Sequence, residues 1–132
     1  MTENKDLSIL NKIQKIRKEI RREKVEPKSY NDYSKNNYFS LQELENIIYP
    51  KVEDVNIYLD YNFTNVNKTA YLIAIDLDNT KSSCKIEIPY NDISNIVTEK
   101  KTYITKYIGQ ITSLKKLLLM NMFLIIENKN NE

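Results

Sequence analysis

The sequence contains no histidine and no tryptophan, and its 132 residues include only one glycine, one cysteine and three prolines. Without histidine, the chain lacks the commonest general base and the commonest metal ligand. A single cysteine, Cys84, cannot form an internal disulfide, and we interpret it as a small buried strand residue. Neither a Cys/His cluster nor a glycine-rich phosphate loop is present, so we expect no zinc site, no nucleoside-triphosphate hydrolysis and no cofactor.

Charge is unevenly distributed along the chain, although the net charge is only +2. Residues 12–24 hold seven lysines and arginines against two glutamates, and residues 98–116 hold five lysines against one glutamate. These segments carry +5 and +4, which leaves −7 for the rest of the chain. Two basic segments on an acidic body indicate a polyanionic partner more strongly than the average charge does.

The length of the chain fits a single domain over residues 1–132, with a core that needs no disulfide or metal. The first residues are polar and no long uncharged apolar run follows. We therefore expect a soluble, cytoplasmic protein without a signal peptide, a transmembrane helix or a membrane partner. Residues 127–132 are predicted to be a frayed tail.

The first predicted element is a basic amphipathic helix over residues 6–24. Its apolar residues recur at helical spacing and are Ile9, Leu10, Ile13, Ile16 and Ile20. Its other face carries Lys12, Lys15, Arg17, Lys18, Arg21 and Arg22. A helix of this kind can be a solvated surface helix packed by its isoleucines, a nucleic-acid-binding arm or an oligomer contact.

Residues 25–39 are predicted to form a loop, because Pro27 breaks the helix and polar residues follow. Four aromatic residues, including Tyr38, lie among lysines in this segment. Aromatic side chains between basic ones can stack on nucleic-acid bases, and they can equally cover a core.

A short helix is predicted over residues 40–49. Ser40 and Glu43 have the spacing of a capping box, in which each side chain bonds the backbone amide of the other residue. Pro50 is expected to stop this helix. The helix has a complete structural explanation and requires no functional one.

Three strands are predicted over residues 55–63, 68–76 and 83–88. The first and third alternate apolar with polar residues, which indicates one buried face. The second is apolar on both faces and is predicted to be the central strand. The connections are short and rich in turn residues, so an antiparallel meander is the simplest topology. With helices before and after the sheet, the predicted class is α+β.

The only glycine, Gly109, lies within the closing helix predicted over residues 99–122. A glycine there costs about 1 kcal/mol relative to alanine, and the close approach of a partner backbone is one reason to keep it. The apolar stripe predicted to pack on the sheet comprises Ile104, Tyr107, Ile108, Ile111, Leu114, Leu118 and Met122. At 100° per residue, Lys106, Gly109, Ser113 and Lys116 fall on the opposite side. This shallow basic strip is a candidate surface for a phosphate backbone.

Candidate catalytic residues are few. Asp76, Asp78, Lys85 and Glu87 are predicted on neighbouring strands and resemble a metal-dependent nuclease site only faintly. The order Lys85-Ile-Glu87 reverses the usual Glu-x-Lys pattern, and Asp78 is at a turn, where aspartate is favoured for structural reasons. We therefore predict that the protein is not an enzyme and has no catalytic or metal site.

Lysine and tyrosine provide suitable chemistry for binding nucleic acid. Lysine neutralises phosphates and releases counterions, and tyrosine stacks on unpaired bases. No predicted helix has the Arg, Asn and Gln content that reads base edges in the major groove. Single-stranded nucleic acid, bound with little sequence preference, fits this composition better than duplex does.

The chain resembles the ERF (essential recombination function) family of phage and plasmid single-strand annealing proteins. Members begin with a Lys-rich helix, continue through a Tyr-Phe turn, a helix and a small sheet, and close on a helix with a Gly-x-x-x-Thr-Tyr-x-Arg-Arg-Tyr-x-Leu motif. The matching positions are Tyr38, Phe39, residues 41–48, the three strands, and then Gly109, Thr112, Lys115, Lys116 and Leu118. The resemblance covers roughly residues 7–126, and the arginine pair of the motif is replaced by Lys115 and Lys116.

This resemblance implies a fold similar to the core of Rad52-type annealing proteins and a homo-oligomer that forms a ring or filament. It also implies ATP-independent binding and annealing of single-stranded DNA during recombination. The residues assigned to DNA binding are Lys106, Gly109, Ser113, Lys115, Lys116, Tyr103, Tyr38, Arg21 and Arg22. The alternative is a protein-interaction module, or a shortened paralogue that co-assembles with or inhibits an annealing protein.

Overall fold

A computed structural model of the chain describes residues 3–32, 35–64, 67–90 and 100–126, with side chains described for all of these except 3–6 and 100–107. In chain order the elements are α1 (Glu3–Glu23), β1 (Ser29–Asn31), β2 (Asn36–Tyr38), α2 (Leu41–Asp54), β3 (Ile57–Thr64), β4 (Thr69–Asp76), β5 (Ser83–Pro89) and α3 (Lys100–Phe123). The predicted α+β class is confirmed.

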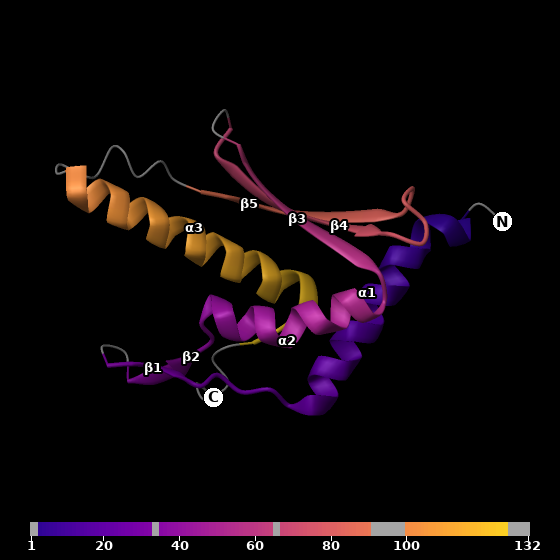
Figure 1. Ribbon diagram of the computed structural model, residues 1–132, viewed down its shortest axis with the longest axis horizontal. Coiled ribbons are helices and arrows are strands. Elements are labelled where there is room, and N and C mark those ends of the chain that lie inside the picture. The colour runs from indigo at the N-terminus through magenta and orange to yellow at the C-terminus, as the bar shows by residue number, and fades with distance from the viewer. Residues whose placement is uncertain (1–2, 33–34, 65–66, 91–99, 127–132) are drawn as a thin grey trace.

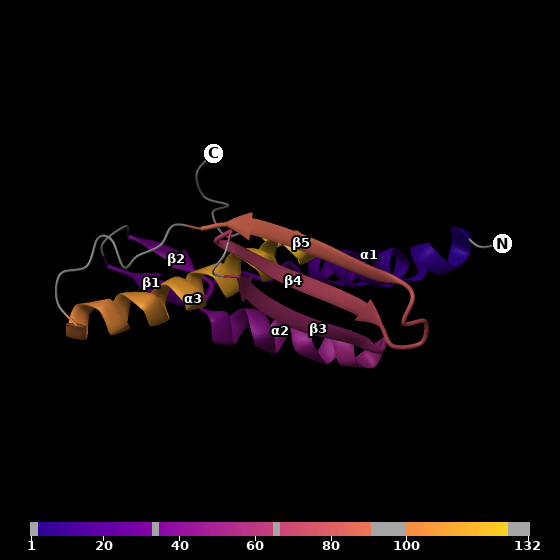
Figure 2. The same ribbon diagram turned by 90° about the horizontal axis from the view of Figure 1, so that it is seen from above.

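The main sheet is an antiparallel meander in the order β3-β4-β5, as predicted. The three helices lie on one side of it (Figure 1), and in the view from above no described helix covers the other side (Figure 2). Along the central strand the side chains alternate strictly: Ala70, Leu72, Ala74 and Asp76 are buried beneath the helices. The residues between them face the open side and are half-buried. The sheet therefore has one face packed on the core and one open face.

Four isoleucines anchor α1 to the core. Ile9, Ile13, Ile16 and Ile20 are spaced by four, three and four residues, and each side chain is at most 4% exposed. This spacing keeps them on one face of the helix. Leu10, which the sequence pattern grouped with them, is 46% exposed, because it projects to the side of that stripe. The core-facing stripe of α1 is thus narrower than predicted.

The second helix does not stop at Pro50, contrary to the sequence prediction. It runs from Leu41 to Asp54 with Pro50 inside it. Proline in a helix interior costs one hydrogen bond and crowds the preceding turn. The helix continues because its last turn places Val52, which is 4% exposed, in the core after Leu44 and Ile48. The capping box at Ser40 and Glu43 is present as predicted.

The segment predicted to be a loop contains a small hairpin, β1–β2. Three residue pairs join its two strands, and the outermost is Ser29 with Tyr38. The turn uses Lys35 in the left-handed region (φ 61°), where its amide bonds the carbonyl of Asn31 at 2.8 Å. Lysine in this conformation and strands of three residues leave no hairpin signal in the sequence, which is why the prediction was wrong.

Among its described side chains, the closing helix, α3, is buried in the core through its C-terminal half. Leu114, Leu118, Leu119, Met122 and Phe123 are each at most 5% exposed. Ile108, predicted to belong to the same buried stripe, is 60% exposed. The side chains of Ile104 and Tyr107 lie outside the described residues.

The chain turns sharply at the end of α3. Leu124 takes a left-handed conformation (φ 56°), and the Ile125 amide bonds the Met120 carbonyl at 2.9 Å. This six-to-one bond is the hydrogen bond of a Schellman motif. It returns Ile125 to the core, where it is 6% exposed. Leu124 and Ile126, on either side of it, are exposed.

Candidate nucleic-acid interface

The predicted strip on α3 is open to solvent at its described small residues. Gly109 and Ser113 are both exposed, and a Cβ added at Gly109 would meet no described atom within 4 Å. Packing within the described chain therefore does not require a glycine at this position. The side chains of Lys106 and Tyr103 lie outside the described residues.

Lys115 and Lys116 of α3 each lie against an aromatic ring on a different element. The ammonium of Lys115 is 5.2 Å from the ring centre of Tyr61 on β3, and that of Lys116 is 4.9 Å from the ring centre of Tyr38 on β2. Both distances are within the range of cation–π contacts. The structure thus brings together two of the predicted site residues, Lys116 and Tyr38, while Lys115 points toward the sheet.

Tyr61 provides a neutral aromatic surface beneath Lys115. Burial, followed by interaction with Tyr49, raises the pKa of Tyr61 far above its ordinary value. Its hydroxyl is buried and makes no hydrogen bond of normal geometry within the described part of the chain. Its ring stacks on Phe63, with ring centres 6.4 Å apart and planes at 12°. Tyr61 therefore stays protonated near neutral pH, and its role at this position is packing rather than proton transfer.

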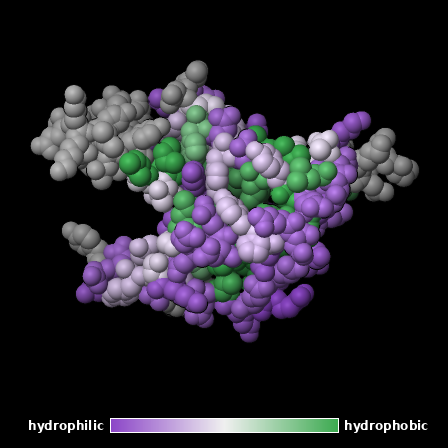
Figure 3. All heavy atoms as spheres, viewed as in Figure 1, coloured by the Kyte–Doolittle hydropathy of each residue, from purple (hydrophilic) through white to green (hydrophobic). Residues whose placement is uncertain are grey.

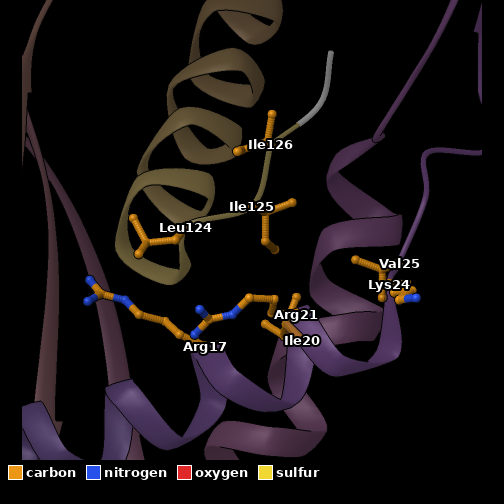
Figure 4. A pocket seen from close by; sticks show the side chains of 8 residues that line it. All are labelled: Arg17, Ile20, Arg21, Lys24, Val25, Leu124, Ile125 and Ile126. Atoms are coloured by element: carbon orange, nitrogen blue, oxygen red, sulfur yellow. The ribbon is translucent and has the colours of Figure 1, made fainter. Parts of the chain in front are cut away.

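A pocket of about 320 Å³ lies where the C-terminal end of α1 meets the turn after α3. Its lining residues are Arg17, Ile20, Arg21, Lys24, Val25, Leu124, Ile125 and Ile126. Figure 4 shows the Arg17 and Arg21 side chains extending in the same direction below Leu124, with Lys24 beside Val25 at the other end. Three cations and five apolar side chains thus surround the space, and none of the eight lining residues is acidic.

Arg17 has a structural role in this pocket. Its Nε donates to the carbonyl of Met122 at 2.9 Å, near the C-terminal end of α3. A cation at that end of a helix satisfies a free carbonyl and opposes the negative end of the helix dipole. Arg21 and Lys24 make no ion pair with another described residue, so their charges remain available for a ligand.

The sequence prediction found only part of this pocket. It assigned Arg21 and Arg22 to DNA binding, and both side chains are exposed in the last turn of α1. Arg21 lines the pocket and Arg22 does not. The sequence prediction did not include Leu124 and Ile126, which also line the pocket. They are 63% and 66% exposed.

The acidic residues considered for catalysis are divided between the two faces of the sheet. Asp76 is buried on the helix side, where its carboxylate is 2.6 Å from the ammonium of Lys12, and Asp78 is 2.7 Å from the same ammonium. Lys85 and Glu87 are exposed on the open face. No group of three His, Cys, Asp or Glu side chains that could hold a metal ion occurs among the residues described.

The Lys12–Asp76 contact also shifts the titration of both groups. Burial raises the pKa of Asp76, but hydrogen bonds from Lys12, Ser8 and the Asp78 amide outweigh it and leave that pKa below its ordinary value. For Lys12, burial lowers the pKa, and the bonds to both aspartates more than compensate, so the pKa is raised. Both shifts favour the charged forms of Lys12 and Asp76. Their ion pair therefore holds α1 against the end of β4.

No family model, curated protein or solved structure matches this chain. The resemblance to the ERF family stays a prediction that rests on the motifs quoted above. Within the described part of the chain, no helix is both long enough and apolar enough to cross a membrane.

Proposed function

We propose that this protein binds single-stranded nucleic acid through the basic end of α1 and the pocket beside it. The observation that carries the proposal is the lining of that pocket, where Arg17, Arg21 and Lys24 surround apolar side chains without an acidic residue among them. The exposed face of α1 leading to it carries further cations, and Figure 3 shows mostly hydrophilic side chains over this helix in the lower right of the view. Polyanions favour such a surface.

A nucleotide combines the two properties that the pocket offers to a ligand. Its phosphate would contact Arg21 and Lys24, whose charges are not paired within the described chain. Its base has an apolar face that fits against Leu124 and Ile126, which are exposed apolar side chains at the rim. Bases in a duplex are stacked on each other and are not available for such a contact, so a single strand fits better.

The resemblance to the ERF family gives this proposal its specific form, ATP-independent annealing of single-stranded DNA by a homo-oligomer. On α3, the Lys116–Tyr38 pair then supplies a second contact, because a tyrosine ring with a cation over one face can still receive a base at its edge or other face. Gly109 and Ser113 leave the adjoining surface of α3 low enough for a backbone to approach. Arg22 adds positive charge beside Arg21 on α1, and Lys115 adds it beside Lys116 on α3.

The experiment is a titration of a fluorescent oligothymidylate with the protein between about 50 and 300 mM salt. The variant Arg21→Gln/Lys24→Asn removes two charges, and asparagine tolerates the left-handed backbone of Lys24 (φ 53°). Two lost phosphate contacts should lower the affinity at least about tenfold and reduce the salt slope by about 1.5. Lys81→Gln, which removes one charge at an exposed lysine in the β4–β5 turn, is the control for charge loss away from the pocket and should change little.

Two outcomes would contradict the proposal. If the wild-type protein fails to bind the oligonucleotide at low salt, nucleic-acid binding is wrong. If it binds and the double variant behaves like the Lys81→Gln control, the site is elsewhere. Annealing of complementary oligonucleotides, measured in the same buffers, tests the part of the proposal that comes from the ERF resemblance.

The alternative, a protein-interaction module, is favoured by a different observation. The open face of the sheet carries half-buried and exposed apolar side chains, among them Tyr58, which is 50% exposed. A face of this kind is typical of an interaction surface. Failure to bind nucleic acid, together with self-association or capture of an annealing protein, would favour this alternative.

A further inference from the structure

The open face of the sheet has an apolar centre and mostly polar edges. Tyr71, Ile73 and Ile75 form a column along β4 and are half-buried, although no described element covers them (Figure 2). Two outer columns flank them: Tyr58, Asp60 and Asn62 on β3, and Ser83, Lys85 and Glu87 on β5. The Lys85 ammonium lies 4.7 Å from the ring centre of Tyr71, which confirms that both side chains share this face.

The strand register places opposite charges symmetrically about the centre. Ile73 pairs with Asp60 on one side and with Lys85 on the other. Asp60 and Lys85 are therefore two strands apart at the same level of the sheet, about 10 Å from each other. Neither forms an ion pair with another residue in the described part of the chain. Each thus has an unpaired charge that a partner could neutralise.

We propose that this face packs against the same face of a second copy of the chain, about a two-fold axis that runs parallel to β4. Such an axis exchanges left and right but preserves the position along the strand. Ile73 then meets Ile73 of the other copy, and Asp60 meets Lys85 of the other copy. The contact contains two equivalent Asp60–Lys85 pairs around an apolar centre, as an isologous interface requires.

The other face-to-face arrangement is disfavoured by the same charges. A two-fold axis perpendicular to the strands would place β3 over β3 and β5 over β5. With that axis at the level of Ile73, Asp60 would face Asp60, and Lys85 would face Lys85. Like charges opposed across an interface are costly, so the charge pattern selects the axis parallel to β4.

The size of the face predicts a weak dimer. The face is three strands wide, with about 4.8 Å between strands, and seven residues long, with a rise of about 3.3 Å per residue. Its projected area is therefore roughly 300 Å² per copy. Stable interfaces bury about 800 Å² of accessible surface per partner. We therefore expect a dissociation constant in the micromolar range or weaker, and a dimer that appears as the protein concentration rises.

The first measurement is sedimentation velocity of the wild-type protein from about 10 µM to about 1 mM, without nucleic acid. A concentration-dependent shift from monomer to dimer is expected. A protein that remains monomeric throughout this range overturns the proposal. Because no nucleic acid is present, the result does not depend on whether the proposed function is correct.

Charge reversal then tests the arrangement. Asp60→Lys and Lys85→Glu each place like charges opposite each other twice, and each should weaken the dimer by about tenfold or more. The double variant Asp60→Lys/Lys85→Glu restores both pairs with exchanged signs and should return the dimerisation constant to within about threefold of the wild-type value. These residues are exposed, so the variants should fold, which circular dichroism would verify.

The control is Glu53→Lys, which makes the same change in net charge as Asp60→Lys on the helix side of the sheet. It should leave dimerisation nearly unchanged. If Asp60→Lys weakens the dimer no more than this control, or if the double variant fails to restore it, the proposed interface is wrong. Assembly into larger species that none of the four variants alters would also overturn it.

Discussion

The helices α1 and α3 are both amphipathic in sequence, but they are supported very differently in the fold. The four isoleucines of α1 are buried from Ile9 to Ile20, and Lys12 fastens the same helix to the sheet through Asp76. On α3, the described apolar residues are buried only from Leu114 onward, and Ile108 is 60% exposed. Apolar periodicity therefore predicts which face of a helix is apolar. It does not predict along how much of its length that face packs against other elements.

The largest expected effect tests the buried C-terminal part of α3. Leu118 is fully buried, and replacing it with alanine leaves a cavity, so Leu118→Ala should destabilise the protein by about 3 kcal/mol. Leu117, its neighbour on the same helix, is 47% exposed, and Leu117→Ala should cost less than about 1 kcal/mol. Chemical denaturation measures both. Equal losses would contradict the burial pattern of α3.

The next effect tests the ion pair that joins α1 to the sheet. Asp76→Asn removes one carboxylate from Lys12, and we expect a loss of about 2 kcal/mol, less than for a fully enclosed pair because Lys12 is 20% exposed and keeps Asp78. Asp78 is 62% exposed, so Asp78→Asn is the matched control and should cost below about 1 kcal/mol. Urea denaturation at neutral pH compares the two variants.

The same pair predicts a pH dependence. The pKa of Asp76 is lower in the folded protein than in the unfolded chain, so its contribution is fully present above the ordinary carboxyl pKa of about 3.9. That contribution is lost as the pH falls through the folded pKa. The stability difference between wild type and Asp76→Asn should thus shrink in acid. A difference that stays constant as the pH falls would show that Asp76 does not act through its charge.

The smallest effect has the opposite sign and tests an exposed position of α3. Gly109 is exposed within a helix and has no described neighbour that a Cβ would touch, so Gly109→Ala should stabilise the protein by up to about 1 kcal/mol. Thermal denaturation measures the change. If the variant also loses affinity for the oligonucleotide, close approach of the ligand explains the glycine. If affinity is unchanged, this part of α3 lies outside the interface.

Several features could be predicted because their causes are local. The isoleucine spacing of α1, the Ser40–Glu43 capping box and the alternating strands each follow from interactions between residues close in the chain. The predicted helix end at Pro50 was wrong because burial of Val52, a tertiary effect, outweighs the local cost of proline. The β1–β2 hairpin was missed because Lys35 occupies a left-handed turn position without a glycine signal.

The candidate site shows the same division. Lysine and tyrosine content indicated nucleic acid, and Arg21, which was assigned to DNA binding, lines a pocket in the structure. The partners of Lys115 and Lys116 could not be predicted, because Tyr61 and Tyr38 are far away in the sequence and meet these lysines only after α3 packs against the sheet and the hairpin. The apolar side of the pocket likewise required the turn at Leu124.

The sequence by itself determined the class of the fold, the order of its main elements and the two basic segments, because backbone propensity and side-chain periodicity act over a few residues. Only the tertiary structure decided which described residues of α3 are buried, which face of the sheet stays open and which cations surround an apolar pocket. Those features depend on distances between residues far apart in the chain. The packing of α1 and α3 against each other and the sheet sets these distances.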